Sequence, residues 1–191
     1  MTQPIDDKVA RALLRRIVGK DERAFAELHR LMARRIYAFT FHRLQNEDMA
    51  ETVVADTMLE VWHSAARFRG ESLVSTWIFG IARFKRLELA RQEPQDERMK
   101  EDIDEHSEDL VSDAEDGEVA LDKWQQQQIV RNCLKTLTAA HRECMQLVYY
   151  EGLPLAEIAR VQAMPENTIK TRLYYARKYM RACVERGGGS P

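Results

Sequence analysis

The chain has 191 residues, 45% of them hydrophobic, and a formal net charge of −2 at pH 7. This length fits one domain or two small ones. No apolar run approaches the roughly 20 residues of a membrane span, and the first residues lack the apolar core of a signal peptide. The sequence therefore predicts a cytoplasmic protein with no membrane span of its own.

The N-terminal body, residues 5–92, is predicted to be helical throughout. A first helix is expected over residues 8–18. Asp21 and Asn46 are the predicted N-caps of the second and third helices, because their side chains can accept hydrogen bonds from the free amides at a helix start. After a turn, Ser72 or Ser75 is expected to start a fourth helix.

The third helix presents an acidic outward face. An acidic surface repels DNA, which favours a protein partner here, although periodicity alone favours a solvated face. The outward residues are Asp48, Met49, Thr52, Asp56, Leu59 and Glu60.

The fourth helix mixes aromatic and basic residues. At 100° per residue, Trp77 lies on a broad apolar arc, whereas Phe79, Arg83 and Arg86 fall on the opposite side. A ring beside guanidinium groups suits a polyanion with flat bases. Plain helix exterior is the alternative.

An acidic linker is predicted over residues 93–120. Between Glu93 and Glu118 the chain has thirteen acidic and two basic residues, a net charge of −11, out of 31 acidic and 29 basic residues in all. The remainder therefore holds 18 acidic and 27 basic residues, a net charge of +9. With few large apolar residues, this segment is expected to be flexible.

The C-terminal body, residues 121–186, is predicted to hold four helices, with Thr138 capping the second. The last two, a short helix and a longer basic one joined by a tight turn, have the helix-turn-helix pattern, whose longer helix reads the DNA major groove. On the longer helix, Lys170, Thr171, Tyr174 and Lys178 lie opposite the apolar stripe, flanked by Tyr175 and Arg177.

The three cysteines, Cys133, Cys144 and Cys183, lack the paired spacings of a disulfide framework or a zinc module. They are predicted to be buried thiols. His141 and Cys144 would make half a metal site without a second pair, and no glycine-rich phosphate loop or nucleophile–base arrangement is present. The sequence thus predicts no metal, no cofactor, no small-molecule substrate and no enzymatic activity.

Two segments resemble bacterial sigma factors. AETVVADTMLEVW (50–62), RFRGES (67–72) and STWIFGIAR (75–83) are similar to their second conserved region. LTAAHRECMQLVYYEGLPLAEIARVQAMPENTIKTRLYYAR (137–177) resembles the fourth region. With a short linker and no third region, this layout is that of the extracytoplasmic-function (ECF) group, which implies two small all-α domains.

The resemblance also implies roles for particular residues. The outward residues of the third helix would bind core RNA polymerase. Recognition of the −10 promoter element, and capture of a flipped base, would fall to Arg67, Phe68, Arg69, Ser72, Phe79, Arg83, Phe84, Lys85 and Arg86, with Trp77 supporting the core. The −35 element would meet Lys170, Thr171, Arg172, Tyr174, Tyr175, Arg177 and Lys178. An anti-sigma factor, anchored in the membrane, would hold the protein inactive.

The chain departs from the family pattern at several positions. Phe84 stands where asparagine is frequent, and Met49 and Thr52 stand where acids are common. Ala163 and Asn167 replace frequent glycines, and Asn167 is predicted to cap the recognition helix instead. The alternative function is a freestanding helix-turn-helix transcription regulator, which would bind DNA without polymerase but leave the aromatic and basic stripe of the fourth helix unexplained.

Overall fold

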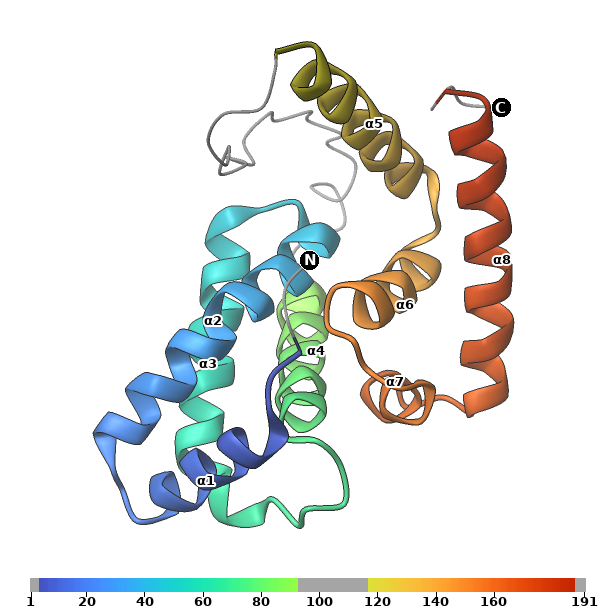
Figure 1. Ribbon diagram of the computed structural model, residues 1–191. Coiled ribbons are helices and arrows are strands. Elements are labelled where there is room, and N and C mark those ends of the chain that lie inside the picture. The colour runs from blue at the N-terminus through green and yellow to red at the C-terminus, as the bar shows by residue number, and fades with distance from the viewer. Residues whose placement is uncertain (1–3, 93–116, 188–191) are drawn as a thin grey trace.

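The computed structural model describes residues 4–92 and 117–187, and its regular elements there are all helices (Figure 1). The predicted all-α class is therefore confirmed, and most of the predicted linker lies outside the described residues. The elements are α1 (Asp7–Val18), α2 (Glu22–Leu44), α3 (Glu47–Ser64), the 3₁₀ turn η1 (Ala65–Arg67), α4 (Val74–Gln92), α5 (Gly117–Thr136), α6 (Ala139–Tyr149), α7 (Leu155–Gln162) and α8 (Glu166–Glu185).

Helices α1 to α4 form the N-terminal body. Their apolar residues recur at helical spacing, as Leu13, Leu14 and Ile17 do on α1, so that each helix buries one face. The predicted caps are confirmed: Asp21 accepts hydrogen bonds from the amides of Arg23 and Ala24, and Asn46 accepts one from the amide of Met49.

Helix α4 is capped from a distance. It begins at Val74, whose N–H donates to the Asp7 carboxylate on α1 at 2.8 Å. A carboxylate from another helix thus meets a free amide at this positive helix end. The prediction that Ser72 or Ser75 starts the helix is wrong, because periodicity could not reveal the neighbouring α1.

Helices α5 to α8 form the C-terminal body. Leu147, Ile158, Ile169 and Leu173 are buried in its core, and Thr138 caps α6 as predicted. Helix α8 starts at Glu166, directly after Pro165. Asn167 therefore lies inside the first turn, and its predicted capping role is wrong.

The turn between α7 and α8 contains a strained residue. Ala163 has φ 51° and ψ 48°, the left-handed conformation that favours glycine. It ends α7, and the next amide, that of Met164, donates to the Ala159 carbonyl at 3.0 Å.

Replacing Ala163 with glycine is expected to raise the free energy of unfolding by about 0.5–1 kcal/mol, because the native backbone angle then carries no Cβ clash. Urea denaturation of the full chain measures this. The matched control is Ala55→Gly, an exposed site inside α3, where the same change should be destabilising by about 1 kcal/mol. A loss of stability at both sites would contradict the strain.

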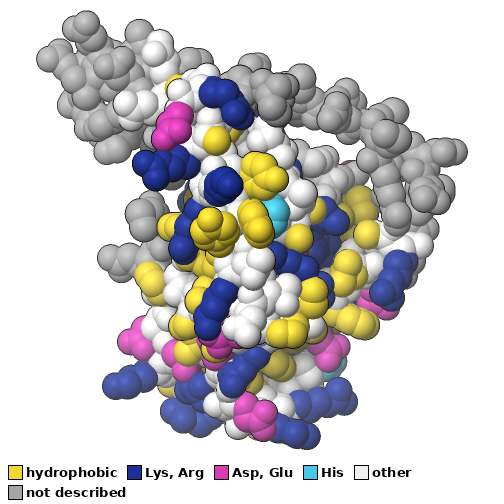
Figure 2. Space-filling model, turned by 90° about the vertical axis from the view of Figure 1, so that its right-hand side faces the viewer, with side chains coloured by type: hydrophobic (Ala, Val, Ile, Leu, Met, Phe, Trp, Pro, Cys, Tyr) yellow, Lys and Arg dark blue, Asp and Glu magenta, His cyan; other side chains and the backbone are white. Residues whose placement is uncertain are grey.

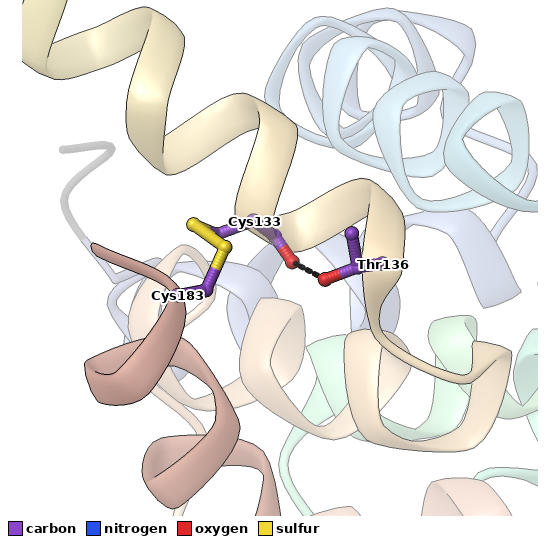
Figure 3. Close-up of a disulfide and its surroundings, with 3 residues drawn as sticks. All are labelled: Cys133, Thr136 and Cys183. Carbon is purple, nitrogen blue, oxygen red and sulfur yellow. Dashed lines mark hydrogen bonds between the residues drawn. A yellow bond between two sulfur atoms is a disulfide. The ribbon is translucent and has the colours of Figure 1, made fainter. Parts of the chain in front are cut away.

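Two of the cysteines form a disulfide, contrary to the prediction of three thiols. Cys133 on α5 and Cys183 on α8 are joined with their Cα atoms 5.7 Å apart, and Thr136 Oγ1 donates to the Cys133 carbonyl (Figure 3). The two residues are 50 positions apart, so sequence spacing held no signal of their contact. Cys144 is a buried free thiol, as predicted.

The two bodies pack against each other. Helix α4 lies between the rest of the N-terminal body and helices α6 and α7 (Figure 1). Buried apolar residues of both bodies, from Phe79 on α4 to Ile158 on α7, form one continuous core. The sequence predicted that the outer side of α4 either binds DNA or is ordinary solvent-exposed helix surface. In the structure, the C-terminal body covers part of that side.

Candidate nucleic-acid interfaces

One face of α8 combines exposed tyrosines and cations. Tyr174 and Tyr175 are 63% and 46% exposed, and Lys170, Thr171 and Lys178 are exposed beside them. Figure 2 shows this side of the molecule, where hydrophobic side chains intermingle with Lys and Arg. Lys170 pairs with Glu166 at 3.0 Å on the surface, a contact of little strength that a phosphate could replace. The face thus carries the donors and rings needed in a major groove.

Two arginines of α8 differ in their availability. Arg177 is exposed, with its Nε donating to the Tyr149 hydroxyl at 3.0 Å. Arg172 is half-buried and donates to Gln162 Oε1 at 2.8 Å, which also accepts from the Cys144 thiol. The structure therefore places Arg172 between α7 and α8, beside the outer face, and its part in −35 binding, which the resemblance implies, stays a prediction.

The loop before α4 is held by α1. Arg11 donates to the Ser72 carbonyl at 2.7 Å, and its guanidinium lies 5.3 Å from the centre of the Phe68 ring. Phe68 in turn packs on Trp77 at 5.4 Å, while Arg67 and Arg69 are exposed. The contacts with Arg11 thus hold the loop in place, while the side chains of Arg67 and Arg69 are accessible to a ligand.

Arg11 and Asp7 were missed as positioning residues. They are 61 and 67 positions from their partners Ser72 and Val74. A charged pair four residues apart on α1 looks like ordinary helix surface, so the sequence held no signal of this role.

The residues predicted on the outer stripe of α4 have separate environments. Phe79 is fully buried and meets the Phe39 ring edge-on at 5.2 Å, so its predicted exposure is wrong. Arg86 is only 4% exposed and also corrects the prediction. Burial lowers the pKa of the Arg86 guanidinium, an effect that the Glu143 carboxylate opposes.

Phe84 and Lys85 lie beside a surface groove of about 510 Å³. Phe84 is 61% exposed, and Lys85 Nζ lies 3.6 Å from Glu88. Trp77 and Ser72 of the N-terminal body and Arg160 of α7 also line this groove. Aromatic rings and cations thus line this groove together with the Glu60 carboxylate, and rings beside cations can stack a base and hold its phosphate.

The acidic face of α3 is exposed as predicted over most of its length. Asp48, Thr52 and Asp56 are exposed, and Leu59 is 55% exposed. Met49 and Glu60 are half-buried. An exposed leucine in an acidic surface fits a protein contact better than a nucleic-acid contact.

Two further findings concern the described residues only. Within 4–92 and 117–187, no three His, Cys, Asp or Glu side chains gather in a way that could hold a metal ion. Over the same residues, none of the helices has the length and apolar character needed to span a membrane.

Each body matches the model of a known protein family. The family described as "Sigma-70 region 2" matches residues 28–94, and the family described as "Sigma-70, region 4" matches residues 127–180. Two solved structures share the fold. CnrH, in complex with the cytosolic domain of CnrY, has a TM-score of 0.64 at 20% identity, over 93% of this chain and 98% of its own. RpoE from Bartonella quintana, in complex with the anti-sigma factor NepR, has a TM-score of 0.66 at 22% identity, over 84% and 96%.

Two curated relatives extend over nearly the whole chain. The ECF RNA polymerase sigma factor SigK of Mycobacterium tuberculosis is 32% identical over 178 residues, 91% of this chain and 92% of its own. SigK of Mycolicibacterium vanbaalenii is 31% identical over 176 residues, 91% and 88% of the two chains. Together with the two matched regions, this similarity shows that the chain belongs to the ECF sigma factors of RNA polymerase.

Proposed function

We propose that this sigma factor binds core RNA polymerase in the cytoplasm and directs promoter-specific initiation without being an enzyme itself. The N-terminal body, residues 5–92, binds the polymerase and the −10 element. The C-terminal body, residues 121–186, binds the −35 element, and residues 93–120 link them. The observation that carries the proposal is the α8 face, with exposed Tyr174, Tyr175, Lys170 and Lys178 at the reading helix of a helix-turn-helix.

The residues divide by what they would contact. Lys170, Thr171 and Tyr174, near the start of α8, reach base edges, whereas Arg177 and Lys178 bind phosphate and fix the register. In the N-terminal body, Arg67 and Arg69 of the loop and Phe84 and Lys85 of α4 bind the −10 strand. The acidic α3 face, which includes the exposed residues Asp48, Asp56 and Leu59, binds the polymerase.

An anti-sigma factor is the proposed regulator. Both solved relatives were determined with such a protein or with the cytosolic domain of a partner. The cytosolic domain of CnrY in one of these complexes is consistent with a membrane-anchored inhibitor for this chain too.

Replacing Lys170 and Tyr174 together with alanine is expected to lower transcription from a −35-dependent promoter by about 100-fold, since each good base contact is worth about 1–3 kcal/mol. The assay is in vitro transcription with purified core enzyme on a promoter library. Arg186→Ala, a control at the exposed end of α8, should transcribe like the wild type.

The same assay separates the alternative function. A freestanding regulator would bind its DNA site alone in a gel shift, whereas this protein should need core polymerase. Specific DNA binding without polymerase, together with no transcription when polymerase is added, would contradict the proposed function.

A further inference from the structure

The ion pairs between the two bodies all have the same polarity among the described residues. Among the described residues, each such pair takes its cation from the N-terminal body and its carboxylate from the C-terminal body. Arg35 pairs with Glu151 at 2.9 Å, and Arg86 pairs with Glu143 at 2.9 Å. Arg83 Nε lies 3.4 Å from the other oxygen of Glu143.

These pairs are shielded from water. The side chains of Arg35 and Glu151 are 11% and 5% exposed, and those of Arg86 and Glu143 are 5% and 12% exposed. Burial raises the pKa of Glu151, and the Arg35 guanidinium opposes that rise. Removing one member of a pair in such a place leaves a buried charge without compensation, so the loss of a carboxylate here should weaken the contact between the two bodies more than the loss of a surface pair would.

A third carboxylate occupies the start of α4. Glu157 on α7 accepts a hydrogen bond from the Leu73 N–H at 3.2 Å. Arg160, one turn later on α7, donates to the Glu71 carbonyl and lines the groove beside Phe84. An amide at a helix N-terminus is a favourable place for an anion, a phosphate included. Helix α7 thus lies on the loop assigned above to the −10 strand.

We propose that the C-terminal body inhibits the N-terminal body within the same chain, with Glu143 and Glu157 standing where promoter phosphates would bind. The proposal rests on the function proposed above, since the covered groups matter only if α4 and its loop bind DNA. The single N–H of Leu73 is already bonded to Glu157, and Arg86 is 4% exposed and paired with Glu143, so neither group can bind a phosphate while the two bodies are docked. Docking of the two bodies, called closure from here on, and binding of the −10 element therefore exclude each other.

The exclusion makes opening a required step. A ligand shifts a two-state equilibrium only by its difference in affinity for the two states. Polymerase and promoter DNA bind the open chain, in which the two bodies are separated. The free energy needed to separate the bodies therefore lowers the apparent affinity of the chain for both. Weakening closure without touching a DNA-binding residue should make the protein a stronger initiator.

The test compares the wild type with a Glu143→Gln/Glu157→Gln variant of the full chain. Dyes on Ala26→Cys and Gln126→Cys, both exposed and one on each body, report the distance between bodies by single-molecule energy transfer. The open fraction should rise by about tenfold or more in the variant. Glu185→Gln, an exposed acid on α8 outside the contact, is the matched control and should stay closed.

A second readout tests inhibition itself. With core polymerase, the variant should reach half-maximal transcription at a severalfold lower concentration than the wild type. Glu143→Asp, which keeps the charge, should remain closed, and circular dichroism verifies the helical fold of each variant. An unchanged distance distribution in a folded variant overturns the proposal, as does opening without any gain in transcription. If no protein transcribes, the function proposed above fails, and the distance distribution still decides whether these carboxylates hold the chain closed.

Discussion

Replacing Phe79 with alanine should lower the free energy of unfolding by about 3–5 kcal/mol, the usual cost of deleting a buried phenyl ring. Phe79 is fully buried, and the Phe39 ring packs on its edge. Because α4 packs against α2 and α3 on one side and α7 on the other, the surrounding helices cannot all move to fill the space left behind. Urea denaturation followed by circular dichroism measures the loss.

The matched control for Phe79 is on the same helix. Phe84→Ala removes an identical ring that is 61% exposed, so it should change the free energy of unfolding by no more than about 0.5 kcal/mol. If both variants lost the same stability, or if Phe79→Ala lost none, the placement of Phe79 in the core would be refuted.

Removing the disulfide should lower the free energy of unfolding by about 2–4 kcal/mol. Cys133 and Cys183 are 50 residues apart. In the chain-entropy model, a cross-link over such a loop raises the free energy of the unfolded state by about 4 kcal/mol, and measured disulfides often stabilise by less than this model predicts. Denaturant unfolding with and without reductant measures the difference. The Cys133→Ser/Cys183→Ser double variant should be insensitive to reductant.

A thiol titration supplies the control for the disulfide. The unreduced wild type, unfolded in denaturant, should show one reactive thiol, that of Cys144, out of three cysteines. Cys144→Ala should show none and keep its sensitivity to reductant. Three reactive thiols in the freshly purified wild type would sink the disulfide.

Local features of this protein could be predicted from its sequence. Asp21, Asn46 and Thr138 cap their helices because capping is decided by residues two or three positions apart. The helical period likewise identifies the buried face of α8. The all-α class follows from such local rules.

Features that depend on distant segments could not be predicted in this way. Phe79 and Arg86 fall on the face of α4 opposite Trp77, and neighbouring helices make that face an interior one: both residues meet the Phe39 ring of α2, and Arg86 also pairs with Glu143 of α6. Arg172 faces Gln162 of α7, a contact set by how α7 and α8 cross. A helical wheel records which residues share a face, but it does not record what covers that face.

The anchoring by α1 of the loop proposed to bind the −10 element has a practical consequence for anyone who excises this domain. The matched region 2 begins at residue 28, whereas Asp7 and Arg11, which hold Val74 and Ser72, lie before it. A fragment trimmed to the family boundary would keep every side chain proposed to touch the strand and still lose the scaffold that shapes it. Weak DNA binding by such a fragment would then reflect the loss of the α1 residues that fix the loop, and not the loss of a residue that contacts DNA.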